Sequence, residues 1–437
     1  MEIRSLPMFV RTRSRTLGPK PALRRVAGGA DQSWTWADTW AHARTLALAL
    51  LDDGLAEGEP VILWAGEEPE ALFAEVGLQA AGALAVCVPL GCTAAGVSAV
   101  ASALGARRLL AFGPTREAMD DVLRAQPGLQ ARFLPRAQPA PVGDGARLDP
   151  WSDDPRLEER LGRRGPDSLA LALVSLDAQG IVQGRILTQG NLLGVGLAVA
   201  AALGAGEDDA WWVAGPWRGA FPRTAGVAAA WLSGGELILA PDIQASLQVL
   251  WRAGPTIAVL PATVAASLAR QAADEVEQAQ GIPGRMSRWM FRHSLPEGPR
   301  GLLERGLAAL AAATGAATPS EVVGGRLTRV LTDGAGPAPE SVGLFRALGV
   351  STWTAVGNDV TAGVATLERL PAAGGPAPVV PGTCVRREAD GEVSVQGVAA
   401  APPLSVLRAP QELPADRFYR TGLLGHVAGD GVTWDDL

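Results

Sequence analysis

The side chains that could carry nucleophilic or general-base chemistry are few in this chain of 437 residues. Only one of its 38 basic Lys and Arg residues is a lysine, Lys20. A Schiff base, a lysine general base or a Walker-type phosphate loop would each have to use it, because a guanidinium stays protonated and cannot replace an amine. Lys20 lies in a basic, Pro-flanked N-terminal stretch. The sequence therefore argues against these three kinds of site.

The histidines and cysteines are also scattered. His42, His293 and His426 are expected to be helix or hairpin residues, and Cys87, Cys92 and Cys384 to be free thiols of a reducing compartment. Neither set has the spacing of metal ligands, and the chain has no G-x-S-x-G elbow and no G-x-G-x-x-G after a strand. We expect no metal site, and a cytoplasmic location.

The composition is that of a folded globular protein, with 48% hydrophobic and 19% charged residues. The formal net charge of −7 argues against nucleic-acid binding, which needs a concentrated basic face. Residues 76–106 carry no charge, but Pro89 and Gly91 interrupt them, so we expect no transmembrane segment. The basic residues before position 26 predict a solvated N-terminal segment over residues 1–30.

The elements that must position any site alternate between helix and strand. Helices are predicted at 36–51, 67–81, 93–104, 114–124 and from Thr188, and strands at 60–64, 84–89, 108–112, 169–175, 236–240 and 256–260. This alternation is typical of parallel α/β sheets. Residues 262–315 read as mainly helix. After about residue 375 the Val-rich pattern changes to strands, with a hairpin around Asp390-Gly391.

Five segments, in this order, carry a family resemblance. They are Trp34-Thr-Trp-Ala-Asp through Gly58-Glu-Pro-Val-Ile-Leu, Ala80–Leu90, Pro216-Trp-Arg-Gly-Ala-Phe-Pro-Arg223, Pro255–Pro261, and Asp333-Gly-Ala-Gly-Pro337 with Leu344–Gly349. The ordered set resembles the adenylate-forming acyl-CoA synthetase superfamily, and within it the long-chain fatty acyl-CoA ligases. The resemblance covers nearly the whole chain.

The segment that resembles the family's phosphate loop lacks most of the side chains that bind phosphate in the family. The family reads T-S-G-T-T-G-x-P-K-G, whose hydroxyls, amides and lysine hold ATP phosphates. This chain keeps Gly180 and Gly184 of a loop that starts at Ser175, and Asn191 of the following x-H-x-N motif. Gln183 stands at the lysine position. The other replacements are Leu176 for serine, Asp177 for glycine, and Ala178 and Gln179 for threonines.

The two other nucleotide motifs are also altered. The Y-G-x-T-E motif that holds adenine and Mg²⁺ in the family corresponds to Val356 with Gly357, Asn358, Asp359 and Val360, and we expect Asp359 to cap its own backbone. The ribose motif T-G-D corresponds to Thr421, Gly422 and Leu423. The chain ends where the family continues into a C-terminal domain with the adenylating lysine, so we expect that catalytic domain to be absent.

The family's acyl pocket corresponds to residues of two segments. By resemblance its candidates here are Trp217, Gly219, Arg223, Gly334, Ala335 and Gly336. Trp211, Trp212 and Trp231 lie in the same region. These indoles either line a pocket or are ordinary core aromatics.

The resemblance implies an α/β fold, the large N-terminal domain of the acyl-CoA synthetase fold. Two doubly wound α/β subdomains are expected over residues 31–374 and a small β-barrel-like subdomain over 375–437.

For function, the altered motifs favour a catalytically inactive homologue, a pseudoenzyme that needs no cofactor. It would act as a binding, scaffolding or regulatory subunit beside an active acyl-CoA synthetase, another acyl-pathway enzyme or a second copy of itself. Two alternatives stay open. One is an AMP-forming acyl-activating enzyme with a remodelled site for ATP and Mg²⁺ and a C-terminal domain in trans. The other is a carrier or sensor of an acyl ligand.

Overall fold

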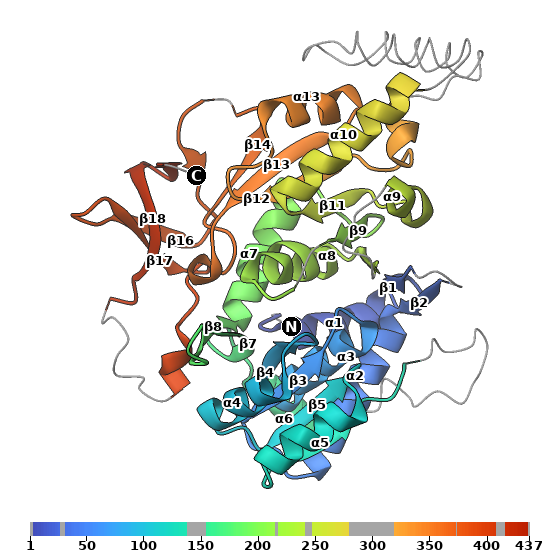
Figure 1. Cartoon of the computed structure of the whole chain (residues 1–437), viewed down its shortest axis with the longest axis vertical. Helices are drawn as coiled ribbons and strands as arrows, with labels where there is room; N and C mark the ends of the chain where they lie inside the picture. The colour runs from blue at the N-terminus through green and yellow to red at the C-terminus, as the bar shows by residue number, and fades with distance from the viewer. Residues whose placement is uncertain are drawn as a thin grey trace.

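The computed structural model describes residues 3–26, 31–137, 154–214, 217–240, 247–278, 319–372, 374–407 and 416–435. Three sheets form the molecule, two of them mainly parallel and covered by helices and the third antiparallel (Figure 1). The predicted helical region beyond residue 278, with His293, lies outside these residues, as does Pro216. None of the described helices is both long and apolar enough to cross a membrane.

The first sheet contains six strands in the order β6-β5-β3-β4-β7-β8. The strands are β3 Pro60–Ala65, β4 Leu84–Pro89, β5 Arg108–Phe112, β6 Gln130–Phe133, β7 Leu169–Leu176 and β8 Val182–Thr188. Its helices are α2 Trp36–Asp52, α3 Pro69–Ala81, α4 Ala94–Leu104, α5 Arg116–Ala125 and α6 Pro155–Arg163. Only β8 runs antiparallel to its neighbour, β7. The sequence prediction missed β8 but placed β4 and β5 at their observed bounds.

The second sheet contains eight strands in the order β14-β13-β12-β11-β9-β10-β1-β2. The strands are β1 Pro21–Arg25, β2 Gln32–Thr35, β9 Ala210–Val213, β10 Glu236–Leu239, β11 Ile257–Leu260, β12 Arg329–Asp333, β13 Ser351–Val356 and β14 Thr366–Leu370. Its helices are α7 Gln189–Ala202, α8 Ala229–Leu232, α9 Leu247–Ala253, α10 Ala262–Gln278, α13 Pro339–Ala347 and the π-helix η1 Pro222–Ala228, while α1 Leu6–Thr16 packs against α2 and α3. In Figure 1, α7 lies between the two α/β sheets.

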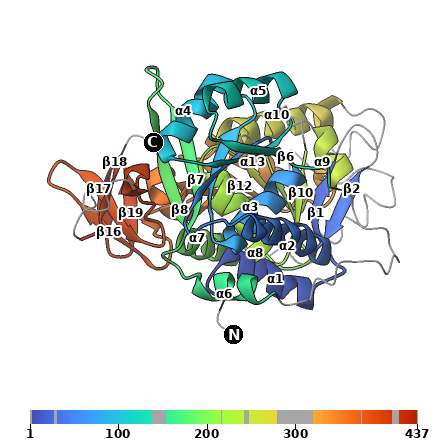
Figure 2. The ribbon, with the colours of Figure 1, turned by 90° about the horizontal axis from the view of Figure 1, so that it is seen from below.

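The third sheet is the β-rich C-terminal part, in the order β15-β19-β18-β17-β16. The strands are β15 Ala377–Pro378, β16 Thr383–Arg387, β17 Glu392–Gly397, β18 Tyr419–Ala428 and β19 Gly431–Trp434. The predicted hairpin at Asp390-Gly391 is confirmed as the turn between β16 and β17. Figure 2 shows this sheet at one side of the molecule, beside β7 and β8.

The N-terminal segment packs into the folded core through its apolar side chains, so the prediction of a solvated segment is wrong for residues 6–25. Leu6, Phe9 and Val10 of α1 are buried, and β1 pairs in parallel with β10. The Leu6 amide donates to Oε1 of the buried Gln189. The prediction rested on the number of charges and overlooked apolar residues at helical spacing. Such an apolar stripe favours burial of one helix face even when arginines lie on the other face. Lys20 lies at the surface beside Glu207 and Asp208.

Most tryptophans in the predicted pocket region belong to the core. Trp211, Trp212 and Trp231 are fully buried. Trp211 and Trp212 are consecutive in β9 and therefore belong to cores on opposite faces of the sheet. These three tryptophans are therefore ordinary core residues and do not line a pocket, whereas Trp217 borders a cavity.

Candidate functional site

The segment that resembles a phosphate loop is a tight turn between β7 and β8. Oδ1 of Asp177 accepts hydrogen bonds from the amides of Gln179 (3.0 Å) and Ile181 (2.8 Å), and Oδ2 accepts one from Nε2 of Gln183 (3.0 Å). The Gly180 amide donates to the Asp177 carbonyl. The carboxylate thus uses amide donors that a phosphate would need, and its partner is the side chain at the lysine position.

The loop residues that match the family have structural roles in this chain. A Cβ at Gly184 would lie 2.0 Å from the carbonyl oxygen of Leu173 in the paired strand. Gly180 has φ +77°, which the turn requires. The buried Asn191 caps α7 and donates through Nδ2 to the carbonyls of Val398 and Ala400. These three positions therefore need their residues whether or not a nucleotide binds.

Asp359 does not cap its own backbone, so that prediction is wrong. Its Oδ1 accepts a hydrogen bond from the amide of Ala220, 2.7 Å away and 139 residues distant in sequence. The local cap is provided by Asn358, whose Oδ1 accepts from the Val360 amide. Gly357 is confined, because a Cβ there would lie 2.5 Å from Oγ1 of Thr361. The hydrogen bond of Asp359 thus connects the residues just before η1 to the turn that follows β13.

The ribose-like motif meets the adenine-like motif. Nδ2 of Asn358 donates to the Thr421 carbonyl (2.7 Å), and Oγ1 of Thr421 donates to the carbonyl of Val393 in β17. The Gly422 amide donates to Oε1 of Glu392. Leu423 is half-buried and its side chain offers no hydrogen-bond acceptor.

Arg185 of β8 lies near the same junction. Burial lowers the pKa of its guanidinium, while Tyr419 and Asp359 act to raise it. Nη1 of Arg185 donates to the Ala401 carbonyl, and the Ala401 amide donates to the Val360 carbonyl. The three motif segments, separated by up to about 240 residues in sequence, therefore converge as the resemblance implies.

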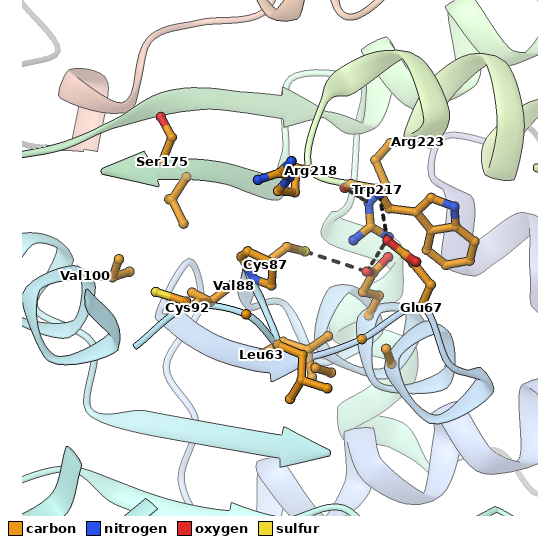
Figure 3. A pocket seen from close by; sticks show the side chains of 18 of the residues that line it. Leu63, Glu67, Cys87, Val88, Cys92, Val100, Ser175, Trp217, Arg218 and Arg223 are labelled. Atoms are coloured by element: carbon orange, nitrogen blue, oxygen red, sulfur yellow. Dashed lines mark hydrogen bonds and ion pairs between the residues drawn. The ribbon is translucent and has the colours of Figure 1, made fainter. Parts of the chain in front are cut away.

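A cavity of about 640 Å³ lies beside this region (Figure 3). It is formed at the carboxyl ends of β3, β4 and β7 and closed by the segment at 217–223. Its lining residues are Leu63, Ala65, Gly66, Glu67, Ala71, Glu75, Cys87, Val88, Pro89, Leu90, Gly91, Cys92, Val100, Val174, Ser175, Leu176, Trp217, Arg218 and Arg223.

A buried ion pair anchors the 217–223 segment at this cavity. Nη1 of Arg223 lies 2.5 Å from Oε1 of Glu75, and both side chains are less than a tenth exposed. Sγ of Cys87 also donates to Glu75, and Nε of Arg223 donates to the Trp217 carbonyl. Burial raises the pKa of Glu75, and the adjacent guanidinium counteracts that effect. Desolvation acts against the charge of Arg223, but the Glu75 carboxylate raises its pKa.

The predicted acyl-pocket residues are only partly brought together. Trp217 and Arg223 border the cavity, whereas Gly219, Gly334, Ala335 and Gly336 do not. The last three belong to the turn after β12, where Gly334 accepts a hydrogen bond from Thr354. Sequence reasoning missed Glu75, although a carboxylate next to Val76 in an otherwise apolar part of the predicted helix 67–81 was a usable signal. No comparable signal marked Cys92 or Arg218.

The thiols at the cavity are expected to react slowly. Burial raises the pKa of Cys92, and burial together with Glu75 raises that of Cys87 further, whereas Cys384 is exposed. A chromogenic disulfide reagent at neutral pH should therefore label Cys384 first, Cys92 more slowly, and Cys87 most slowly of the three. Peptide mass spectrometry of time points identifies the order, and labelling of Cys87 as fast as Cys384 would contradict it.

Within the described ranges, no group of three or more His, Cys, Asp or Glu side chains could hold a metal ion.

Comparison of the chain with models of known protein families identifies one family. The model of the family described as AMP-binding enzyme matches residues 10–380. No curated protein sequence matches the chain.

Solved structures are similar over the whole length. A putative long-chain-fatty-acid CoA ligase from Rhodopseudomonas palustris has a TM-score of 0.72 at 17% identity, covering 99% of this chain and 98% of that one. VinN in complex with L-aspartate has a TM-score of 0.70 at 16% identity, with 99% of both chains covered. The inhibitor-bound N-terminal domain of FACL13 from Mycobacterium tuberculosis has a TM-score of 0.69 at 16% identity, again covering 99% of both. At these identities the likeness establishes the fold.

Proposed function

The chain belongs to the AMP-binding enzyme family, and from that premise we propose that it is a member that forms no adenylate and acts as a binding or regulatory subunit. The observation that carries the proposal is the closed loop in which Asp177 accepts two loop amides and the side chain of Gln183. In the resembling family these positions are a glycine and a lysine that serve phosphate binding.

Electrostatics supports the same conclusion. A phosphate placed against the loop would meet the Asp177 carboxylate, and two like charges about 4 Å apart repel by roughly 4 kcal/mol at an effective dielectric of 20. No lysine is available to offset this, because the only one, Lys20, pairs with Glu207 and Asp208 at the surface. A codon preference for arginine over lysine does not explain this position, because it would place an arginine there, whereas Gln183 carries no charge.

The pattern of retained and replaced residues adds a second line of support. The retained Gly184, Asn191, Gly357 and Thr421 each make a backbone contact or a hydrogen bond that the fold needs. The replaced positions are those whose side chains serve the nucleotide in the family, including Val360 for the metal carboxylate and Leu423 for the ribose acceptor. Loss of chemistry with retention of structure is the pattern expected when a fold is kept for binding.

Calorimetric titration tests the proposal. We expect no heat of binding for Mg·ATP, or for a non-hydrolysable acyl-adenylate mimic, up to millimolar concentrations. A pyrophosphate-exchange assay with a panel of fatty and aromatic acids should stay at background. Micromolar binding of either nucleotide would instead favour an acyl-activating enzyme with a remodelled ATP site.

The subunit role has its own test. Light scattering of the purified chain, alone and co-expressed with an active acyl-CoA ligase of the same organism, should reveal either self-association or a stable complex. A chain that is monomeric alone and in every such mixture would contradict the role as a subunit.

A further inference from the structure

The strand β6 is the outermost strand of the six-stranded sheet, and among the described residues only β5 pairs with it. The amides of Gln130 and Leu134 donate to carbonyls within residues 107–111. Because alternate residues of a paired strand face the same neighbour, the amides and carbonyls of Ala131 and Phe133 point away from β5. The free edge of β6 therefore offers hydrogen-bond donors and acceptors to a further strand.

An aromatic ring with an arginine over it lies on each face of the sheet at this edge. Phe133 is 42% exposed, and the guanidinium carbon of Arg116 lies 6.0 Å from its ring centroid. Phe133 is in register with Ala111, which packs with residues of α5, so this first pair lies on the α5 face. Phe112 follows Ala111 and points to the opposite face, where the guanidinium carbon of Arg136 lies 5.4 Å from its ring centroid.

The charges of these two exposed arginines are not neutralised by ion pairs. Neither Arg116 nor Arg136 forms an ion pair with a carboxylate of the described residues. Burial raises the pKa of Glu68, and Arg25 and Arg136 act against that effect, but only Arg25 pairs with this carboxylate (3.3 Å). A guanidinium over a ring keeps the N–H groups at its rim available to a carboxylate. The edge therefore carries positive charge on both faces of the sheet.

We propose that the free edge of β6 binds an extended acidic segment of a partner protein, which adds to the sheet as a further strand. The backbone of such a segment can pair with the outward-facing groups of Ala131 and Phe133. Its successive side chains alternate between the two faces of the sheet, so its carboxylates reach Arg116 on one face and Arg136 on the other. Apolar side chains between these carboxylates cover the exposed ring of Phe133.

Other occupants match this edge less well. A second copy of the chain, paired edge to edge, would bring the same arginines together, and like charges on neighbouring strands repel. An anionic lipid surface would meet the arginines but would make no use of the outward-facing backbone of Ala131 and Phe133. The inference depends on this edge and not on the nucleotide loop. Peptide binding can therefore fail while the absence of Mg·ATP binding stands, and the reverse.

The peptides E-V-E-E-V-E and Q-V-Q-Q-V-Q form a matched pair of probes, because both present polar and apolar side chains on each face and differ only in charge. Fluorescence anisotropy of the dye-labelled peptides should show saturable binding of the acidic one to the full chain, and about 10-fold or more weaker binding of the other. Arg116→Gln combined with Arg136→Gln should weaken the acidic peptide by about 10- to 100-fold. Arg124→Gln changes an exposed arginine in the last turn of α5 and should leave the affinity unchanged.

The backbone pairing has its own test. The acidic peptide with every backbone nitrogen methylated should bind about 10-fold or more weakly, because it cannot donate to the edge. Ala131→Pro removes an amide that faces away from β5, which an edge strand tolerates, and should also weaken binding while the urea midpoint stays that of the parent chain.

Four results would overturn the proposal. They are no binding of the acidic peptide, equal binding of its uncharged counterpart, equal binding of the methylated peptide, and a loss with Arg124→Gln as large as that with the double variant. Vesicles that contain phosphatidylglycerol give a further comparison. If the chain binds these vesicles through Arg116 and Arg136 but does not bind the acidic peptide, the edge serves a lipid surface and the proposal is also wrong.

Discussion

Arg223→Met is expected to lower the free energy of unfolding by about 3–5 kcal/mol, the usual cost of removing one partner of a buried ion pair. The variant would leave Glu75 ionised in a site where its side chain is only 6% exposed. It would also remove the hydrogen bond from Arg223 to the Trp217 carbonyl, which holds the segment before η1. Urea denaturation followed by circular dichroism measures the change.

The pH dependence of this variant has a definite sign. Burial raises the pKa of Glu75, and without the guanidinium only the hydrogen bond from Cys87 opposes that effect. A carboxyl group whose pKa is higher in the folded than in the unfolded state favours folding at low pH and loses that contribution as the pH rises. The destabilisation of Arg223→Met should therefore be larger at pH 7 than near pH 4.5.

Two further variants serve as controls. Glu75→Leu combined with Arg223→Met removes both charges and should cost less than Arg223→Met alone, since no unpaired charge stays buried. Arg156→Met removes an exposed arginine that pairs with Asp52 and Asp154 and should leave the free energy of unfolding nearly unchanged. Equal losses for Arg223→Met and Arg156→Met would show that burial of the Glu75 pair does not matter.

Binding of Mg·ATP is expected to appear when four positions are changed together. The variant Asp177→Gly, Gln183→Lys, Val360→Glu and Leu423→Asp would open the loop amides and supply the lysine, the metal carboxylate and the ribose acceptor of the resembling motifs. Charge-assisted hydrogen bonds contribute about 1.5–3 kcal/mol each, so two of them raise affinity by roughly 10²–10⁴. Calorimetry with Mg·ATP compares this variant with the unmodified chain.

The pair Asp177→Gly and Gln183→Lys separates the contributions. It should not rescue activity, because Val360 and Leu423 still lack the metal and ribose groups. Pyrophosphate exchange by this pair would refute the argument that several independent losses inactivate the site. The fourfold variant could fail to bind Mg·ATP although it unfolds at the same urea concentration as the parent chain. That result would mean that the backbone of the loop between β7 and β8 no longer forms a phosphate-binding site.

The sequence by itself determined many of the elements and the order of the motifs. The strand at 84–89 is a continuous apolar run and the one at 108–112 is apolar after Arg108, and both lie between helices, a pattern typical of a parallel sheet covered on both faces. The replacements at Asp177, Gln183, Val360 and Leu423 could also be read directly, because each lies in a segment that resembles a motif of the family. The N-terminal helix was missed because charge was counted and the apolar spacing of Leu6, Phe9 and Val10 was not.

Only the tertiary structure decided which polar atoms meet. Asp177 turns to its own loop amides, whereas Asp359 reaches the amide of Ala220, 139 residues away. The cavity combines residues from the ends of three strands with Trp217 and Arg218, which follow much later in the chain. Hydrophobic periodicity is a property of neighbouring residues, but a hydrogen bond or a cavity depends on distances of a few ångströms between element ends, and these are set only when the elements pack.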